Sequence, residues 1–397
     1  MSDLLTKYDA WLKDDGPAAL VIREHLMPVE GSDGVVFPAT YAAAEDKSKF
    51  GGGYNIDRFG TQFEASAKWN GREERGEYGV RFADTRADSN VCLVDSVGSQ
   101  ANRLEPEFAK EKYRSLVPQI AVKAGAKVIS IFEAGHRAGD ALLRCTELKT
   151  ELKTAFLSVA KDDAAPLAKI APTSLVFGAW DSRDTQVKVP RLVSSTIRAF
   201  QVAENSRSAN YLVQQTIDYV KEGLLPEPAN KAEKDRYSER GFLNALATKT
   251  HGGVTAASIR RDATLNLAAL RLLKAGRGED GKDNDPLPLR RYILGLSLVA
   301  FTHPSAFVGY LRQGCTLVRD PDKKAEFVEG YPDGKRAPAG ITHDSALTFA
   351  ENAAKAFGVG ESKTVEFDKK RAQDEVAEAK SDKKAGKGKK AGVETKE

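Results

Sequence analysis

A turn of small polar residues lies between the short apolar run 91–94 and an amphipathic pattern that follows it. A strand that passes through such a turn into a helix leaves backbone N–H groups free, and these can bind a phosphate. Hydroxyl and amide side chains add donors, and an arginine can bond two phosphate oxygens. The alternative is a capped helix whose polar residues bond only within the protein. The candidates are Ser96, Gly98, Ser99, Gln100, Asn102 and Arg103.

A second set of basic and hydroxyl residues follows Trp180 and the turn at 181–184, which indicates a hairpin. Phosphate contacts require charge and donors but no base code, so such a strip could follow a nucleic-acid backbone. An ordinary solvated hairpin is the alternative. The candidate residues are Lys188, Arg191, Ser194, Ser195 and Arg198.

His136 and Asp140 are spaced to share one face of a predicted helix, with Arg137 beside them. A histidine with an orienting carboxylate can act as a general base. The alternative is a structural hydrogen bond at the start of the helix, and the sequence places no nucleophile for a triad. The other histidines share no metal-ligand spacing.

A glycine pair at 252–253 precedes Arg260 and Arg261, which could bind a nucleic-acid backbone or belong to a plain loop and helix. The chain has 60 basic and 56 acidic residues, of which ten and six lie in 369–397, so the rest is neutral. A polyanionic partner of the body must therefore bind to local basic clusters.

The elements that position these residues are predicted from hydrophobic periodicity. Strands interspersed with helices indicate an α+β or α/β body. Apolar runs predict strands at 19–26, 35–41, 91–94, 174–180, 186–193 and 292–301. Apolar residues that recur every three or four positions predict helices at 135–159, 211–223, 258–274 and 345–357.

Composition limits the function classes. The longest apolar run, 292–301, is shorter than the roughly 20 residues of a membrane-spanning helix. The first residues show no secretory pattern, and Cys92, Cys145 and Cys315 are too far apart for a disulfide scaffold or a zinc site. The glycine spacing fits neither a P-loop nor a dinucleotide fingerprint. We therefore expect a cytoplasmic protein with no membrane partner, metal or other cofactor.

Several stretches, in their order along the chain, resemble the repeating backbone subunit of type I-G (formerly I-U) CRISPR surveillance complexes, a branch of the RAMP superfamily. No single stretch is diagnostic, but the set is specific and extends from about residue 20 to 320. The stretches are VVFPATY at 35–41, DSVGSQANRLE at 95–105, HR at 136–137, DALLR at 140–144, PTSLVFGAWDS at 172–182, RLVSSTIR at 191–198, GGV at 252–254, IRR at 259–261 and LRQGC at 311–315.

The resemblance implies a ferredoxin-like, RNA-recognition-motif core, the palm, enlarged by finger and thumb insertions. We expect one body at 1–368, with inserted loops at 43–90 and 225–257, and a disordered basic tail at 369–397. Copies of the subunit would stack head to tail along a guide RNA (crRNA), beside other subunits of the effector complex. The guide would then pair with target DNA, so that base pairing reads the sequence.

The resemblance carries an RNA-binding role over to the set at 96–103, then to the strip at 188–198, then to His136 and Arg137. Arg260 and Arg261 are also included as RNA-binding candidates. It implies that this subunit does not cut RNA, so no catalytic residue is expected. The alternative is an endoribonuclease of the same superfamily that uses His136 or a loop aspartate: Asp57, Asp84 or Asp88.

Overall fold

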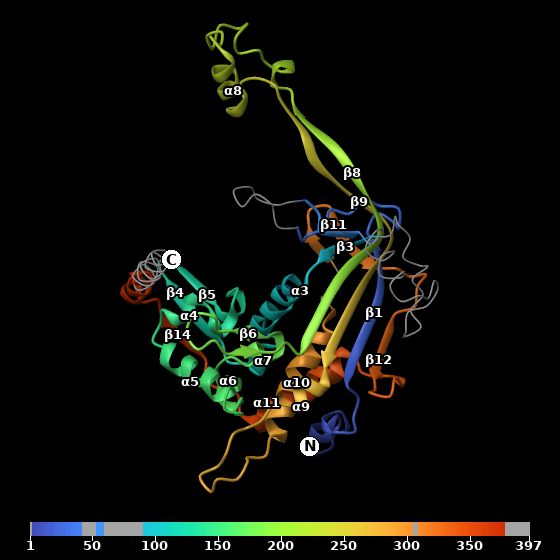
Figure 1. Cartoon of the computed structure of the whole chain (residues 1–397), viewed down its shortest axis with the longest axis vertical. Coiled ribbons are helices and arrows are strands. Elements are labelled where there is room, and N and C mark those ends of the chain that lie inside the picture. The colour runs from blue at the N-terminus through green and yellow to red at the C-terminus, as the bar shows by residue number, and fades with distance from the viewer. Residues whose placement is uncertain (1, 42–52, 59–89, 305–308, 378–397) are drawn as a thin grey trace, which may run out of the picture.

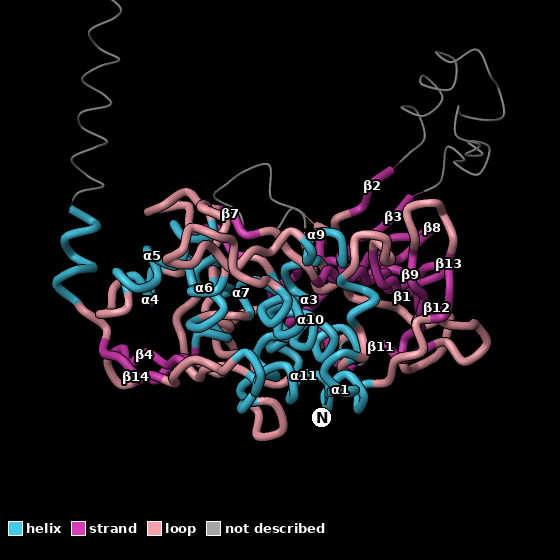
Figure 2. Tube along the Cα trace, turned by 90° about the horizontal axis from the view of Figure 1, so that it is seen from below, coloured by secondary structure: helices cyan, strands magenta, loops and turns pink. Residues whose placement is uncertain are grey.

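The computed structural model describes residues 2–41, 53–58, 90–304 and 309–377, and it shows an α+β protein. A large twisted sheet lies beside a helical body, and a two-stranded arm projects from the sheet (Figure 1). A smaller sheet lies at the far end of the helical body (Figure 2). Asp84, Asp88 and most of the predicted insertion 43–90 lie outside the described residues.

The large sheet contains β1 (Ala19–Pro28), β2 (Ile56–Arg58), β3 (Asn90–Asp95), β8 (Val193–Tyr211), β9 (Ala245–Asn266), β10 (Gly309–Arg312), β11 (Cys315–Arg319), β12 (Glu326–Gly330) and β13 (Arg336–Pro338). The smaller sheet contains β4 (Ile120–Ala124), β5 (Lys127–Ser130) and β14 (Lys363–Glu366), and a separate hairpin contains β6 (Ala179–Trp180) and β7 (Lys188–Val189).

The α-helices are α1 (Ser2–Thr6), α3 (Val97–Leu104), α4 (Ala141–Arg144), α5 (Lys149–Val159), α6 (Ala165–Ile170), α7 (Thr173–Phe177), α8 (Lys231–Glu239), α9 (Leu267–Arg271), α10 (Leu287–Thr302) and α11 (His343–Phe357). Short 3-10 helices are η1 (Asp9–Leu12), η3 (Glu105–Ala109), η4 (Arg114–Leu116), η5 (Ile131–Glu133), η6 (Arg137–Gly139) and η7 (Val213–Gln215).

The central strands of the large sheet have a ferredoxin-like order. β1 pairs with β9 on one side and with β11 and β12 on the other, β9 pairs with β8, and all these pairs are antiparallel. In chain order β1, β8, β9 and the split strand β11–β12 are the four strands, with helices in the first and third connections. This is the β-α-β-β-α-β arrangement. The predicted α+β class is confirmed, and the topology is compatible with the predicted ferredoxin-like core.

Two hydrophobic clusters cover the inward face of this sheet, and a polar layer separates them. Side chains alternate between faces along a strand. On β1, Leu20 and Ile22 belong to the cluster that the helices cover, and Leu26 belongs to the second cluster. Glu24 lies between them and is buried. The same division recurs on β9, where Ala263 and Ile259 flank a buried arginine.

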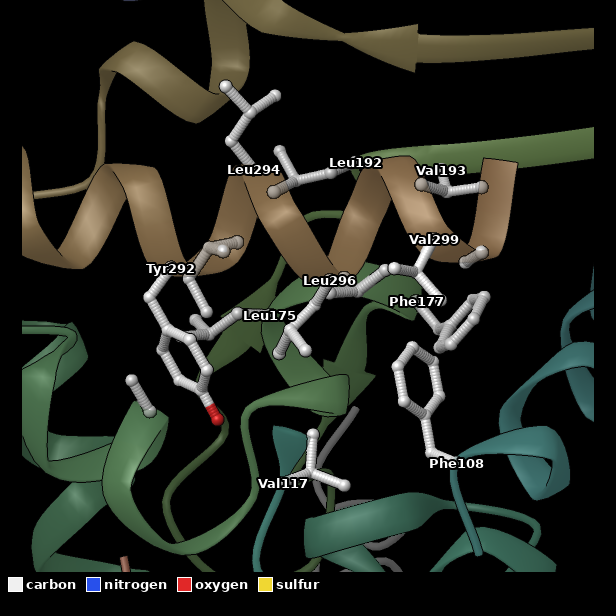
Figure 3. Close-up of a cluster of buried hydrophobic side chains, with 14 of the residues drawn as sticks. Phe108, Val117, Leu175, Phe177, Leu192, Val193, Tyr292, Leu294, Leu296 and Val299 are labelled. Atoms are coloured by element: carbon white, nitrogen blue, oxygen red, sulfur yellow. The ribbon is translucent and has the colours of Figure 1, made fainter. Parts of the chain in front are cut away.

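Helix α10 passes through the larger cluster and is buried on several sides (Figure 3). Leu294 extends toward Leu192, just before β8, and Leu296 extends toward Leu175 of α7 (Figure 3). Every residue at 292–301 is buried. The predicted strand at 292–301 is therefore wrong, because a continuous apolar run suits a fully buried helix as well as a buried strand.

Other predicted elements divide into confirmed and corrected ones. The strands at 19–26 and 91–94 and the helix at 345–357 are confirmed as β1, β3 and α11, and the hairpin across 181–184 is confirmed as β6–β7. The predicted strand at 174–180 is mostly helix α7, and the predicted helix at 258–274 is strand up to Asn266. The predicted helix at 135–159 is broken into η6, α4 and α5. Isolated bridges replace the predicted strand at 35–41.

The arm consists of the outer parts of β8 and β9, with α8 near its tip (Figure 1). The predicted loop at 225–257 therefore contains α8 and the first half of β9, and the predicted helix at 211–223 is reduced to η7. No described residue at 203–253 belongs to either hydrophobic cluster.

Residues 369–377 of the predicted disordered tail are helical and pack on the body, and the rest of that tail lies outside the described residues. Arg371 donates to the backbone oxygen of Thr146. Glu375 forms ion pairs with Arg144 at 3.3 Å and with Lys149 at 3.1 Å. None of the helices in the described ranges has the length and apolar character that crossing a membrane requires.

Candidate nucleic-acid interface

Helix α3 begins where β3 ends, as predicted, and its first turn is well capped. Ser96 is the N-cap, and its Oγ accepts a hydrogen bond from the backbone N–H of Ser99 at 3.2 Å. A Cβ added at Gly98 would lie 4.0 Å from the nearest atom, so this side of the turn is open. Arg103 donates to the Ser99 hydroxyl at 3.2 Å and forms an ion pair at 3.3 Å with the buried carboxylate of Asp95. About a third of the Arg103 side chain is exposed, at 36%.

Gln100 points into the protein and starts the polar layer between the two clusters. Its Nε2 donates to Asp95 at 2.5 Å, and its Oε1 accepts from the Ser195 hydroxyl at 2.9 Å. Ser195 Oγ in turn accepts from Arg261 Nε at 2.9 Å, and Arg261 pairs with Glu24 at 2.8 Å. Gln100, Ser195 and Arg261 are buried and hydrogen-bonded to one another, so in this structure their side chains do not face a ligand, and the alternative of internal bonding is the one that fits them. These side chains supply hydrogen-bond partners for one another in the buried interior.

A pocket of about 560 Å³ opens beside α3. Its walls are the loop before η6, the end of α7 and the β6–β7 hairpin. Two predicted sets that are far apart in the sequence, His136 with Arg137 and Lys188 with Arg191, meet here. The lining residues are Gly135, His136, Arg137, Gly178, Ala179, Trp180, Lys188, Val189, Pro190 and Arg191.

Two glycines allow these walls to approach one another. Gly178 has φ +78°, and a Cβ there would lie 3.2 Å from the backbone oxygen of Val189. A Cβ at Gly139 would lie 3.0 Å from the backbone oxygen of Trp180. Larger residues at either position would push the hairpin away from the wall it packs against.

Arg137 forms the rigid inner wall of the pocket. Its guanidinium pairs with Glu105 at 2.5 Å and donates to the backbone oxygen of Gly178 at 3.3 Å. Burial raises the pKa of Glu105 to about 7, and the attraction of Arg137 opposes that rise. Arg137 has φ +52°, which is unusual for a non-glycine residue and is retained because the surrounding bonds fix it.

Arg191 and Lys188 supply the cationic side of the pocket. Arg191 donates from Nε to the backbone oxygen of Phe177 at 2.8 Å. Burial, followed by repulsion from Arg137, lowers the pKa of Arg191, and Glu105 offsets this only in part. The Lys188 ammonium lies 4.6 Å from the ring centroid of Trp180, whose residue is 49% exposed. An exposed cation–π contact of this kind contributes about 0.5–1 kcal/mol.

Helix α3 adjoins the pocket, because Arg137 Nη2 donates to Asn102 Oδ1 at 3.4 Å, and we take the exposed residues of α3 and of the pocket together as one candidate surface. We call it the α3–pocket surface. Its members are Ser99, Asn102, Arg103, His136, Trp180, Lys188 and Arg191.

Ser194, Arg198 and Arg260 lie on the outward face of the large sheet, which is the opposite face from α3. Arg198 and Arg260 are cross-strand partners on β8 and β9. Arg260 bonds both oxygens of Asp262, at 2.9 and 3.1 Å, and its guanidinium lies 4.7 Å from the Phe200 ring centroid. The predicted continuous strip at 188–198 is therefore divided between two surfaces, because Lys188 and Arg191 lie on and just after the β6–β7 hairpin, whereas Ser194 and Arg198 lie on the outward face of β8.

Asp140 does not orient the imidazole of His136. Its carboxylate accepts from the backbone N–H of His136 at 3.0 Å and from that of Leu142 at 2.9 Å, which caps α4. This agrees with the structural alternative rather than with a catalytic pair. In the part of the chain that the structure describes, no group of three or more His, Cys, Asp or Glu side chains is placed to hold a metal ion.

The sequence alone predicts no binding role for Trp180 or Glu105, although Trp180 lines the pocket and Glu105 pairs with Arg137 in its wall. The signal for Trp180 was present, because an aromatic and a lysine face each other across the predicted hairpin. Glu105 lies in 3-10 helix η3 and is 1% exposed, and its contact with Arg137 follows only from the packing.

A protein-family match covers the segment of the chain that contains the pocket. Residues 20–204 match a CRISPR-associated family. Its model is described as CRISPR-associated protein GSU0053 (Cas_GSU0053). The matched segment is slightly less than half of the chain, and it contains β1 from its second residue, α3 and every residue that lines the pocket. A search of curated proteins found no match. The family match supports a CRISPR-associated function for this chain.

Proposed function

We propose that this chain is a non-catalytic subunit that binds guide RNA and stacks in several copies to form the backbone of a type I-G CRISPR effector complex. The observation that carries the proposal is the α3–pocket surface, which lies within the segment that matches the CRISPR-associated family. Its donors are arginine, lysine, hydroxyl and amide groups, which are the groups that contact a phosphate backbone.

Local charge supports this proposal better than total charge does. The body is neutral, so a polyanion would be held by local cations: Lys188 and Arg191 in the pocket, and Arg103 on α3. Contacts of this kind fix the path of an RNA strand without reading its bases. Sequence recognition would then come from pairing between the guide and target DNA.

The separation of basic residues onto two faces supports a subunit with more than one partner. The outward face carries Arg198 and Arg260 on the other side of the sheet from the α3–pocket surface. The arm projects from the same strands and contributes nothing to either hydrophobic cluster among the described residues. These parts would be available for other copies of the chain and for other subunits of the complex.

The test compares Arg103→Ala and Arg191→Ala with Arg198→Ala, which removes the same side chain from the outward face. Each of the first two variants should weaken binding to unrelated RNA sequences alike, and should reduce the salt slope by about one unit per lost phosphate contact. Binding is measured by fluorescence anisotropy across a salt series. Arg198→Ala should leave this binding within about two-fold.

Three results would count against the proposal. A change of base preference in either first variant would contradict backbone contact, and equal losses in all three variants would contradict the assignment to one face. Cleavage of the bound RNA that disappears in His136→Ala would show an endoribonuclease. Purification from the native host with RNA of uniform length that bears CRISPR repeat sequence is the expected positive result.

A further inference from the structure

We infer that the pocket beside α3 holds one nucleotide of a single-stranded RNA, with its base stacked on Trp180 and its phosphate bound by Arg191. The inference rests on the proposed function, because it specifies how the same surface contacts RNA. It adds that one wall of the surface contacts a base, whereas the rest contacts the backbone.

The size and stiffness of the pocket suit one small, planar group with a charged substituent. Its volume of about 560 Å³ lies within the roughly 300–1,000 Å³ of pockets that hold one small ligand. The wall at Arg137 is fixed by Glu105, Gly178 and Asn102, so the pocket does not have to form when the ligand arrives. A preformed wall reduces the ordering cost of binding.

The aromatic wall is available to a base. Trp180 is 49% exposed at the end of a two-residue strand, and the described contact to its ring is the Lys188 ammonium. Stacking of a base on an aromatic side chain is stronger than an exposed cation–π contact. A base can therefore replace the ammonium, and every base has a face that can stack. The released ammonium can then approach the phosphate.

The charge of the pocket calls for an anion beside the planar group. Arg137 has an ion-pair partner in Glu105, whereas no carboxylate among the described residues forms an ion pair with Arg191 or Lys188. A neutral base alone would leave the half-buried Arg191 uncompensated. A phosphate supplies the missing negative charge, so the fitting ligand is a nucleotide rather than a base or an apolar molecule.

The experiment separates base stacking from backbone contact by changing the RNA as well as the protein. Two fluorescein-labelled RNAs of twelve nucleotides are used: polyuridine, and the same strand with six central positions that lack the base. Anisotropy titrations compare the full-length chain with Trp180→Ala, Trp180→Phe and Arg191→Gln. Tyr310→Ala, which removes a 70% exposed aromatic from strand β10, is the matched control.

We expect Trp180→Ala to weaken binding of polyuridine roughly five-fold or more, and binding of the base-free strand less than two-fold. Arg191→Gln should weaken binding of both strands equally and lower the salt slope by about one. Trp180→Phe should keep the affinity for polyuridine but lose the RNA-induced change in tryptophan emission. Tyr310→Ala should bind both strands as the unaltered chain does.

The inference is overturned if Trp180→Ala weakens both strands equally, or neither, while its thermal unfolding is unchanged. In that case a salt-dependent affinity of the unaltered chain for both strands would leave the proposed function intact. Failure of the unaltered chain to bind either strand at low salt would overturn the proposed function as well. The two failures are therefore distinguishable.

Discussion

Arg260 and Arg261 are adjacent, but one step along a strand gives them different partners. Arg261 points inward, is 1% exposed and pairs with the buried Glu24. Arg260 points outward and pairs with the partly exposed Asp262. The sequence shows two identical side chains, and it assigned both the same RNA-binding role. Their different environments follow from the strand, in which neighbouring residues face opposite sides, and from the register that turns Arg261 inward.

This difference predicts unequal costs for the same substitution. Arg261→Met should reduce the free energy of unfolding by about 3 kcal/mol, because it leaves Glu24 buried without one of its cations. Arg260→Met should reduce it by less than about 1 kcal/mol, because that pair is partly solvated. Urea denaturation followed by circular dichroism measures both values. Equal losses would contradict the polar layer as an internal structural unit.

The residues of the candidate site could be found from sequence more readily than their grouping could. His136, Arg137, Lys188 and Arg191 were all recognised by type and local spacing. Their meeting in one pocket depends on how the loop before η6 packs on the β6–β7 hairpin, which no local pattern encodes. The sequence also does not show that Gln100 and Ser195 are buried. Polar residues that hydrogen-bond to one another inside a protein have the same composition as polar residues on a binding surface.

Among the elements, the predictions failed where burial removed the usual hydrophobic period. In β9, the inward Arg261 interrupts the alternation of Ile259, Ala263 and Leu265. The remaining apolar positions then fit a spacing of three or four, which predicts a helix. In α10, burial of every residue at 292–301 removes the polar face by which a helix is recognised. Elements with one solvated face, such as β1 and α11, were predicted correctly.

The contact between α10 and α11 is a place where one methyl group should matter. A Cβ at Gly295 would lie 2.8 Å from Ala350 Cα and 3.1 Å from Ala350 Cβ. Alanine is favoured over glycine in a helix by about 1 kcal/mol, but overpacking a core costs about 1–3 kcal/mol. We therefore expect Gly295→Ala to lower the free energy of unfolding by about 1 kcal/mol, measured by urea denaturation.

A second variant for this prediction makes room for the added methyl group by removing the Cβ of Ala350 on the other helix. Gly295→Ala combined with Ala350→Gly should lose less free energy than the sum of the two single changes, because the second change removes one of the two close contacts. Strict additivity would show that the helices do not approach one another as closely as described.

At the scale of the whole molecule, two truncations separate the contribution of the basic tail from that of the neutral body, both to stability and to RNA affinity. Removal of 378–397 should leave both thermal stability and RNA affinity nearly unchanged at physiological salt, because the α3–pocket surface lies in the body. Removal of 369–397 should also lower the free energy of unfolding by about 1 kcal/mol, because it deletes the contacts of Arg371 and Glu375 with α4 and α5.

Thermal unfolding and anisotropy titrations check the two truncations together. A loss of RNA affinity greater than ten-fold in the shorter truncation would place the main RNA contact in the tail. Equal stability of the two truncated chains would show that the helix at 369–377 contributes nothing to the body.

The arm has a mechanical consequence that follows from its two strands. β8 and β9 are continuous from the core into the arm, with lengths of 19 and 22 residues, so the ladder that anchors the arm is the same one that forms the centre of the large sheet. Register shifts occur between Glu204 and Ser206 and between Arg207 and Ala209, and bulges are where a strand pair bends. The arm is thus anchored in the large sheet and bends most easily at 204–209. Force applied at the tip bends the outer arm there, while the distances within the pocket stay the same.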